Sequence, residues 1–266
     1  MNTNALALPE RTLKPRSRGL TLVIDNGAPP RYFEDVIEGA SQLIDVVKFG
    51  WGTSVVSDML DRKIACLNER GIAYYFGGTL FEKFLAQGQV EAYHDYCQRY
   101  GCQYVEISNG TIALTNSDKA SHIRRFAQDF HVLSEVGYKD SDRSLKLHPG
   151  QWIDYIHEDL DAGAERVITE ARESGTSGIF RPDGEVRYGL IEQMLASGLD
   201  TSRLIFEAPR KDQQTYFIRR LGSNVNLANI APADVIGLET LRLGLRSDTL
   251  LAFDDIPRCA VERQGA

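Results

Sequence analysis

Eight short apolar runs, each ending at a polar side chain or a glycine cluster and each followed by a helix-like stretch, predict a (β/α)8 TIM barrel. The runs end at positions 25, 48, 77, 106, 135, 170, 207 and 229. The chain has 266 residues, close to the ~250 typical of one such barrel. No glycine/serine linker or low-complexity insert divides it. We therefore expect an α/β fold with one barrel domain at 19–253, an N-terminal arm at 1–18 and a C-terminal tail at 254–266.

The first strand–helix unit illustrates the pattern. Residues 20–24 form a β-branched run of buried-strand character, which Asp25 closes. Pro29 and Pro30 then open a helix, because a missing N–H costs least in the first turn. Apolar residues at helical spacing give that helix one face to lay on the barrel: Phe33, Val36, Ile37 and Ala40. The same reasoning predicts strands at 44–48, 72–76 and 103–107, and helices at 55–70, 81–100 and 117–129.

The second half of the chain repeats this rhythm. A strand at 131–136 precedes a polar loop at 137–148, and Pro149 starts the next helix. A strand at 166–171 precedes a long glycine-rich loop at 173–184. The remaining elements are predicted as a helix at 186–197, a strand at 203–207, a helix at 212–221, a strand at 224–229 and a last helix from Pro232. The two long loops follow strands, so they lie on the catalytic side of a barrel, where long loops usually carry function.

Bulk composition limits the possible partners. Hydrophobic residues make up 42% and charged residues 25%, which is an ordinary globular balance. The net charge is −7 and no basic block occurs, which argues against nucleic acid. No apolar stretch approaches the ~20 residues that span a membrane, and residues 1–18 do not resemble a secretory signal. We expect this arm to be loose or to cover the bottom of the barrel. The four cysteines form no C-x-x-C pair, so reduced thiols in a cytoplasmic protein are expected.

Carboxylates end five of the eight runs, and in a barrel they would project toward its mouth. They are Asp25, Glu106, Glu135, Glu170 and Glu207. A ring of carboxylates cannot stay fully ionised without a cation, because like charges raise one another's pKa. Oxygen ligands of this kind suit Mg2+, which typically takes one or two protein carboxylates. The alternative is that some of these acids are structural, each held by a neighbouring arginine or lysine.

Basic residues alternate with these acids along the chain: Lys48, Lys139, Arg172, Arg210 and Arg181. Lys48 ends an apolar run and is costly to bury unless it meets an anion or an acid. Anion binding or proton transfer is one interpretation, and a salt bridge to Asp25 or Glu106 is the other. Lys139, in the loop after the fifth strand, is a candidate general acid, with an ordinary solvated lysine as the alternative.

Three glycine clusters follow predicted strands, at 50–54, 77–79 and 174–178. Each could aim backbone N–H groups and a hydroxyl at an oxyanion. The candidate substrate-binding residues from these clusters and from the eighth strand end are Gly52, Thr53, Ser54, Gly78, Thr79, Ser174, Gly175 and Asn229. Together they favour a phosphorylated ligand, although none matches G-x-x-x-x-G-K-[ST]. The chain has neither H-E-x-x-H nor G-x-S-x-G, which disfavours a zinc peptidase or a serine hydrolase.

Several of these strings resemble the phosphosulfolactate synthase family. The resemblance covers about residues 19–250 and is carried above all by Lys-Phe-Gly-Trp-Gly-Thr-Ser at 48–54 and Glu-Ala-Arg-Glu-Ser-Gly at 170–175. It implies a TIM barrel that assembles as a homo-oligomer. It also implies a carbon–sulfur lyase that uses Mg2+ to add sulfite to C3 of phosphoenolpyruvate, giving (2R)-phospho-3-sulfolactate for coenzyme M or sulfolactate synthesis.

The resemblance also suggests roles for individual residues. Lys139 would protonate C2, and Lys48 and Arg172 would bind anions, while the metal region would contain Glu106, Glu135 and Glu170. Two positions depart from the family pattern, because Asn26 and Tyr138 stand where lysine is common. A phosphoenolpyruvate-using lyase with another nucleophile is therefore an alternative. A second alternative is a non-enzymatic protein that resembles the heat-stress-associated plant members of the family.

Overall fold

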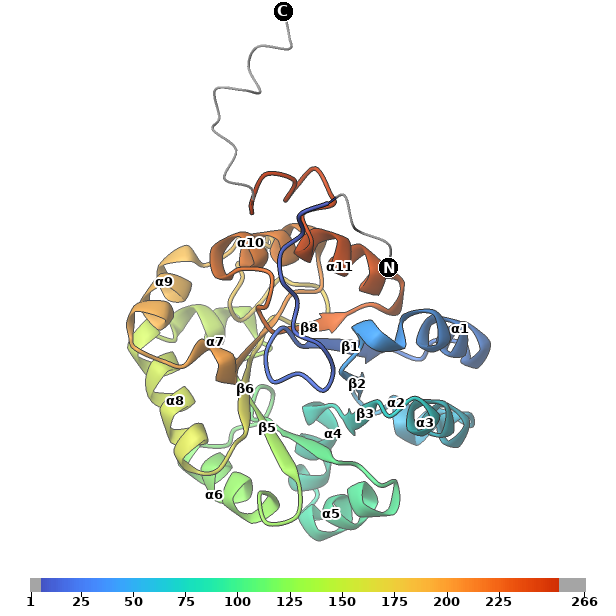
Figure 1. The fold of residues 1–266 in the computed structure, drawn as a ribbon. Coiled ribbons are helices and arrows are strands. Elements are labelled where there is room, and N and C mark those ends of the chain that lie inside the picture. Colours follow the sequence, from blue (N-terminus) through green and yellow to red (C-terminus); the bar gives the residue numbers. More distant parts are fainter. Residues whose placement is uncertain (1–5, 254–266) are drawn as a thin grey trace, which may run out of the picture.

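The computed structural model describes residues 6–253. Eight parallel strands form a nearly closed barrel, and helices surround it (Figure 1). Their order is β3-β2-β1-β8-β7-β6-β5-β4, and β3 and β4 lie against each other where the ring closes. The predicted TIM barrel is confirmed.

The strands are β1 (Thr21–Asp25), β2 (Val46–Phe49), β3 (Ala73–Phe76), β4 (Tyr104–Ile107), β5 (His131–Val136), β6 (Arg166–Thr169), β7 (Leu204–Glu207) and β8 (Leu227–Ile230). The α-helices are α1 (Pro30–Ala40), α2 (Thr53–Val56), α3 (Leu60–Glu69), α4 (Gly78–Ala86), α5 (Val90–Arg99), α6 (Asn116–Phe126), α7 (Ser141–Lys146), α8 (Pro149–Asp161), α9 (Tyr188–Ala196), α10 (Lys211–Leu221) and α11 (Val235–Arg242). Short 3-10 turns are η1 (Ser41–Leu43), η2 (Thr201–Arg203) and η3 (Pro232–Asp234).

Three predicted segments differ from the structure. The helix expected at 81–100 is two helices, α4 and α5, because Gly88 adopts a φ of 69° that a continuous helix cannot contain. The helix expected at 55–70 divides into α2 and α3 at Ser57, whose backbone is extended. The loop expected at 137–148 contains α7, which Asp140 caps by accepting the Arg143 N–H.

Alternation along each strand decides which side chains enter the barrel. Inward positions fill its centre with a small apolar cluster that includes Leu133, Ile168 and Ile205. Outward neighbours such as Val132 and Val167 pack in the larger apolar layer beneath the helices. Successive side chains of a strand point to opposite faces, so the residue two places after an inward residue is inward as well. This rule carries the strand-end glutamates of β5, β6 and β7 to the barrel mouth.

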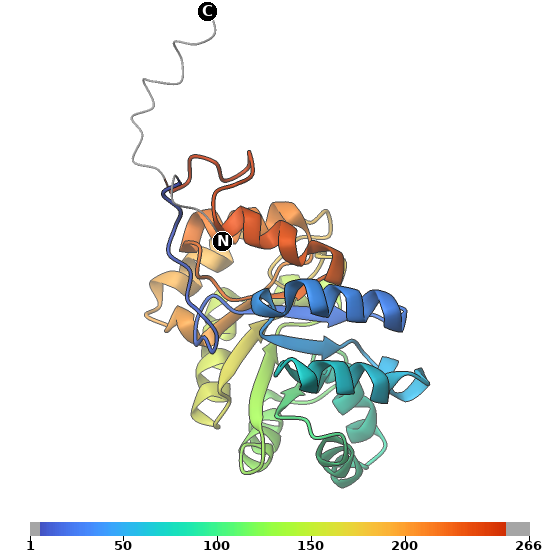
Figure 2. The same cartoon turned by 45° about the vertical axis from the view of Figure 1, so that its right-hand side comes forward.

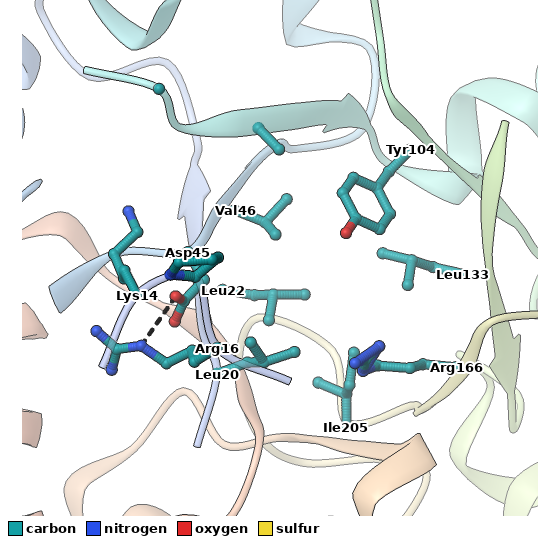
Figure 3. A pocket seen from close by; sticks show the side chains of 13 residues that line it. Lys14, Arg16, Leu20, Leu22, Asp45, Val46, Tyr104, Leu133, Arg166 and Ile205 are labelled. Carbon is teal, nitrogen blue, oxygen red and sulfur yellow. Dashed lines mark ion pairs between the residues drawn. The ribbon is translucent and has the colours of Figure 1, made fainter. Parts of the chain in front are cut away.

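The described part of the arm, residues 6–18, lies across the amino-terminal face of the barrel (Figure 2). Arg11 pairs with Glu239 of α11 at 2.9 Å, and Arg16 pairs with Asp45 at 3.1 Å. Figure 3 looks into a pocket of about 650 Å³ whose walls are residues of the barrel floor and, from the arm, Lys14 and Arg16. This segment therefore covers the floor of the barrel and is anchored there by ion pairs.

Several expectations concern single features of the chain. Within residues 6–253, no helix is long and apolar enough to cross a membrane. Cys66, Cys97 and Cys102 are free thiols. Cys259 and the expected tail at 254–266 lie outside the described residues, as do residues 1–5 of the arm.

Candidate active site

Two lysines, one buried and one half-buried, and four buried glutamates meet at the carboxyl ends of the strands. We call this cluster of Lys48, Glu106, Glu135, Lys139, Glu170 and Glu207 the mouth cluster. The Nζ of Lys48 lies 3.2 Å from Glu106 on β4 and 3.1 Å from Glu207 on β7. The Nζ of Lys139 lies 2.6 Å from Glu135 on β5 and 2.8 Å from Glu170, just after β6. All four glutamates are at most 2% exposed. For Lys48, the ion pair to Glu106 is confirmed, and the alternative pair to Asp25 is not formed.

Both lysines are held as cations. Burial alone would lower the pKa of Lys139, but the carboxylates of Glu135 and Glu170 outweigh it and raise that pKa well above its usual value. The pKa of Lys48 is likewise raised, since Glu106 and Glu207 overcome the effect of burial. Each ammonium is therefore fully protonated at neutral pH.

The glutamates respond unequally to this environment. Burial and the neighbouring carboxylates raise the pKa of Glu106 to about 7, although Lys48 opposes the shift. Burial, followed by the charge of Glu135, raises the pKa of Glu170 well above its usual value. Burial also opposes the ionisation of Glu135, but Lys139 and Lys48 prevail and hold the pKa of Glu135 well below the usual range. Four carboxylates face two lysines, so a fully ionised cluster carries two uncompensated negative charges.

The backbone around the cluster is strained. Among the described residues, the non-glycine positions with positive φ are Trp51 at 49°, Arg172 at 59° and Asn229 at 57°. All three line the same narrow cavity over the mouth cluster. Left-handed backbone at non-glycine residues concentrates at functional sites, where the surrounding structure stabilises it.

Two glycines allow the chain to approach the glutamates closely. The N–H of Gly78, at the start of α4, donates to Glu106 at 2.6 Å, and a Cβ there would lie 2.7 Å from the same oxygen. Gly178 has a φ of 64°, and a Cβ on it would lie only 1.6 Å from the carbonyl oxygen of Glu170. A larger residue at either position would displace a member of the cluster.

The structure brings together only part of the predicted binding set. Gly78, Thr79, Arg172 and Asn229 line the cavity with the mouth cluster. Gly52, Thr53 and Ser54 do not line it, because the chain turns into α2 after Trp51.

The predicted residues from the later loops also lie off the cavity wall. Ser174 is exposed and bonds Thr176, and the carbonyl of Gly175 accepts from Gln213 of α10. Arg210 pairs with Asp212 at 3.1 Å on the surface. The glycine-rich loop thus packs against α10, where the carbonyls of Gly175 and Gly184 accept from Gln213.

Asp25 was expected at the mouth, and this expectation is wrong. The neighbouring Val23 packs in the outer apolar layer, so alternation turns Asp25 outward as well. Its carboxylate pairs with Lys63 of α3 at 2.5 Å and accepts the backbone N–H groups of Gly27 and Ala28. Asp25 is therefore a structural acid held by a lysine, which was the alternative considered from the sequence.

Sequence reasoning missed three residues of the site. Trp51 and Glu173 line the cavity. Ser108, two positions after inward-facing Glu106, donates toward Glu135. The period-2 spacing from Glu106 to Ser108 is the available signal, but Ser108 lies one residue beyond the strand predicted at 103–107.

The mouth cluster offers carboxylate oxygens of the kind that suit Mg2+. Within residues 6–253, no three His, Cys, Asp or Glu side chains form a ready metal cage. Mg2+ rarely uses one, because it keeps waters and substrate oxygens and takes only one or two carboxylates. The amide oxygen of Asn229 is buried at the cavity without a hydrogen-bond partner. The donor set and the two uncompensated charges therefore suit a divalent cation.

Fold and site together are those of a TIM-barrel enzyme with a cluster of charged side chains at its mouth. The family model of (2R)-phospho-3-sulfolactate synthase (ComA) matches residues 9–248. Phosphosulfolactate synthase of Bacillus subtilis (strain 168) is 54% identical over 249 residues, which are 94% of this chain and 99% of the relative. The protein HEAT-STRESS-ASSOCIATED 32 of Arabidopsis thaliana is 22% identical over 88% of each chain.

Among solved structures, 3-hexulose-6-phosphate synthase from Salmonella typhimurium superposes with a TM-score of 0.55, at 10% identity, over 84% of this chain and 97% of that one. At this identity the likeness concerns the fold alone. The sequence relatives go further, and the chain belongs to the (2R)-phospho-3-sulfolactate synthase family.

Proposed function

We propose that this chain catalyses the Mg2+-dependent addition of sulfite to C3 of phosphoenolpyruvate, which gives (2R)-phospho-3-sulfolactate and makes it a carbon–sulfur lyase. Family membership supports the reaction. The observation that carries it is the half-buried Lys139 ammonium, held by the buried carboxylates of Glu135 and Glu170 at a narrow cavity. The reaction forms a C–S bond at C3 and a C–H bond at C2, so it needs a proton donor beside C2.

Lys139 is the proposed proton donor. Attack by sulfite at C3 moves the electron pair of the C2–C3 double bond through C2 toward the substrate carboxylate. A proton delivered from the ammonium to C2 completes the addition, and Lys139 becomes a neutral amine until it is reprotonated. General acids positioned in this way contribute about 10²–10⁴ in rate.

Cationic groups would offset the charge of the two substrates. Lys48 lies within the cavity wall together with Arg172, whose guanidinium is suited to a phosphate or carboxylate. Gly78, Thr79 and Asn229 complete the proposed binding wall. A magnesium ion held by one or two of Glu106, Glu135, Glu170 and Glu207 would stabilise negative charge on the substrate carboxylate.

The test is an assay of purified protein with phosphoenolpyruvate, sulfite and Mg2+, followed by the loss of enol-phosphate absorbance with and without chelator. We expect consumption that needs both sulfite and metal. Lys139→Ala should lower kcat by about 10²–10⁴. The matched control is Lys211→Ala, since Lys211 is an exposed lysine paired with Asp248. Turnover by Lys139→Ala at the wild-type rate would remove this residue as the acid.

Other outcomes would select a different function. Consumption without sulfite would indicate a phosphoenolpyruvate lyase with another nucleophile, which the departures at Asn26 and Tyr138 make worth testing. No consumption under any condition would favour a non-enzymatic role, which is the other alternative drawn from the sequence. The proposal places the enzyme in the cytoplasm, in coenzyme M or sulfolactate synthesis, as a homo-oligomer. Sedimentation of the purified protein tests the oligomer.

A further inference from the structure

The pocket between the arm and the barrel floor, which we call the floor pocket, lies at the end of the barrel opposite the mouth cluster (Figure 3). Layers of inward side chains usually fill the interior of a TIM barrel. Here the lowest layer leaves a space open. Its apolar wall includes Leu22, Val46 and Ile205, which belong to the cluster that fills the barrel centre. An apolar group that enters the floor pocket therefore meets the underside of the inner core.

Two polar side chains enter this apolar wall from the starts of strands. Tyr104 lies two residues before inward-facing Glu106 of β4. Arg166 lies two residues before inward-facing Ile168 of β6. Alternation therefore turns both side chains into the barrel, and Figure 3 shows the Tyr104 hydroxyl and the Arg166 guanidinium directed toward the floor pocket. The Nε of Arg166 is buried and has no hydrogen-bond partner among residues 6–253, whereas buried N–H groups normally have one.

The arm closes the floor pocket from outside, and its own cations are used to hold it in place. Lys14 donates to two backbone carbonyls, and Arg16 pairs with Asp45 at 3.1 Å. Arg166 ties the arm to the pocket wall, because its Nη2 donates to the carbonyl of Ser17 at 3.0 Å. One guanidinium therefore contacts the arm and also presents its Nε–H at the pocket.

The charges around the floor pocket favour a ligand with one negative charge. The cations are Lys14, Arg16 and Arg166, and the carboxylates are those of Asp45 in the wall and Glu165, which pairs with Arg166 at 2.6 Å. Three cations against two carboxylates leave one positive charge, in a chain whose net charge is −7. A carboxylate has two oxygens to accept from two donors, the Tyr104 hydroxyl and the Arg166 Nε–H.

We propose that the floor pocket is a second binding site, separate from the mouth cluster, for a small organic carboxylate with an apolar body. The carboxylate accepts from Tyr104 and Arg166, the apolar body packs on the underside of the inner core, and the arm closes over the ligand. This site does not depend on the proposed reaction, since none of its residues belongs to the mouth cluster.

Sodium benzoate is the probe, because it joins a carboxylate to an apolar ring. Titration into isotope-labelled full-length protein should shift the backbone amide NMR signals of Leu22, Tyr104 and Arg166. Tyr104→Phe removes only the hydroxyl and should weaken binding at least about tenfold, as expected for one hydrogen bond to a charged group. The matched control is Tyr188→Phe, which changes an exposed tyrosine of α9 outside the pocket wall and should bind as the wild type does.

Three outcomes would overturn the proposal. Shifts confined to the residues around the mouth cluster, such as Gly78 and Asn229, would place benzoate at the mouth. Equal affinity of Tyr104→Phe and wild type would remove the hydroxyl as a ligand contact. No shifts at millimolar benzoate would mean that the floor pocket holds only water.

Further measurements test the ligand class and the closing role of the arm. Benzyl alcohol lacks the charge and inorganic phosphate lacks the apolar body, so both should bind more weakly than benzoate. Equal or tighter binding of either one would contradict the ligand class. Benzoate should also slow the cleavage by trypsin after Arg16, because the bound ligand stabilises the closed arm. Cleavage at an unchanged rate would show that the arm does not close over the ligand.

Discussion

The raised pKa of Glu106 makes a quantitative prediction about the metal-free protein. Its pKa is 4.5 in an ordinary environment and about 7 in the fold, mainly because the carboxyl is buried. The folded state therefore binds a proton more tightly than the unfolded state does. The resulting stabilisation is complete below about pH 4.5 and is lost as the pH rises through about 7.

The size of the effect follows from the shift. A difference of about 2.5 pKa units corresponds to about 3 kcal/mol, at 1.36 kcal/mol per unit. For a chain of this size, that is roughly 6–12 °C in melting temperature. Other buried acids with raised pKa values, such as Asp159, change the stability with pH in the same direction. Their contribution is removed by comparing the wild type with a variant that lacks only the Glu106 carboxyl.

The assay compares wild type with Glu106→Gln by urea unfolding in chelator between pH 5 and pH 8. Glutamine cannot ionise, so the wild type should lose about 2.5 kcal/mol more stability than the variant across this range, because a small part of the effect is already lost at pH 5. Saturating Mg2+ should reduce the difference if the ion binds the ionised cluster. Glu192→Gln, which changes an exposed carboxylate, should follow the wild-type curve. Parallel curves for wild type and Glu106→Gln would refute the reasoning.

Three further predictions concern other parts of the fold. Lys63→Met leaves Asp25 buried without its cation, so urea unfolding should show a loss of about 3–5 kcal/mol while KM stays unchanged; a change in metal affinity would instead return Asp25 to the mouth. Gly178→Ala should abolish turnover in a protein that still gives a folded circular-dichroism spectrum, since its Cβ would collide with the Glu170 carbonyl, and normal kcat would contradict this. Arg11→Met removes the pair to Glu239, so limited proteolysis should cut residues 6–18 faster at unchanged kcat; unchanged cleavage would show that the other arm contacts suffice.

The barrel and most of its mouth could be predicted because two periodicities govern them. Apolar runs separated by amphipathic helices determine the fold class. The strand ends then supply Glu106, Glu135, Glu170 and Glu207, and all four reach the mouth. Asp25 does not reach the mouth. Side chains alternate between the two faces of a strand, so a shift of one residue in the alternation turns a side chain to the opposite face. When both faces of a strand are apolar, the sequence alone does not reveal which of its residues point into the barrel.

The loop residues were harder to predict because no periodicity constrains them. Lys139 reaches the mouth because Glu135 and Glu170 hold its ammonium, whereas Arg210 finds Asp212 on the surface. Both residues follow a strand, and nothing local to either one distinguishes them. Glycine clusters were similarly ambiguous: Gly78 turns its N–H to Glu106, while Gly175 packs against Gln213 of α10.

The energetics of the mouth cluster argue that it is kept for chemistry and not for stability. Removing two lysines and four glutamates from water costs several kcal/mol per ion, and their attraction repays this only in part. In the cluster the pKa of Glu106 is still raised to about 7, and carboxylates outnumber lysines. A scaffold selected for stability alone would be better served by apolar residues of similar volume. Groups with strongly perturbed pKa values that converge on one cavity are typical of a proton-transferring site, which supports the proposal that Lys139 transfers the proton.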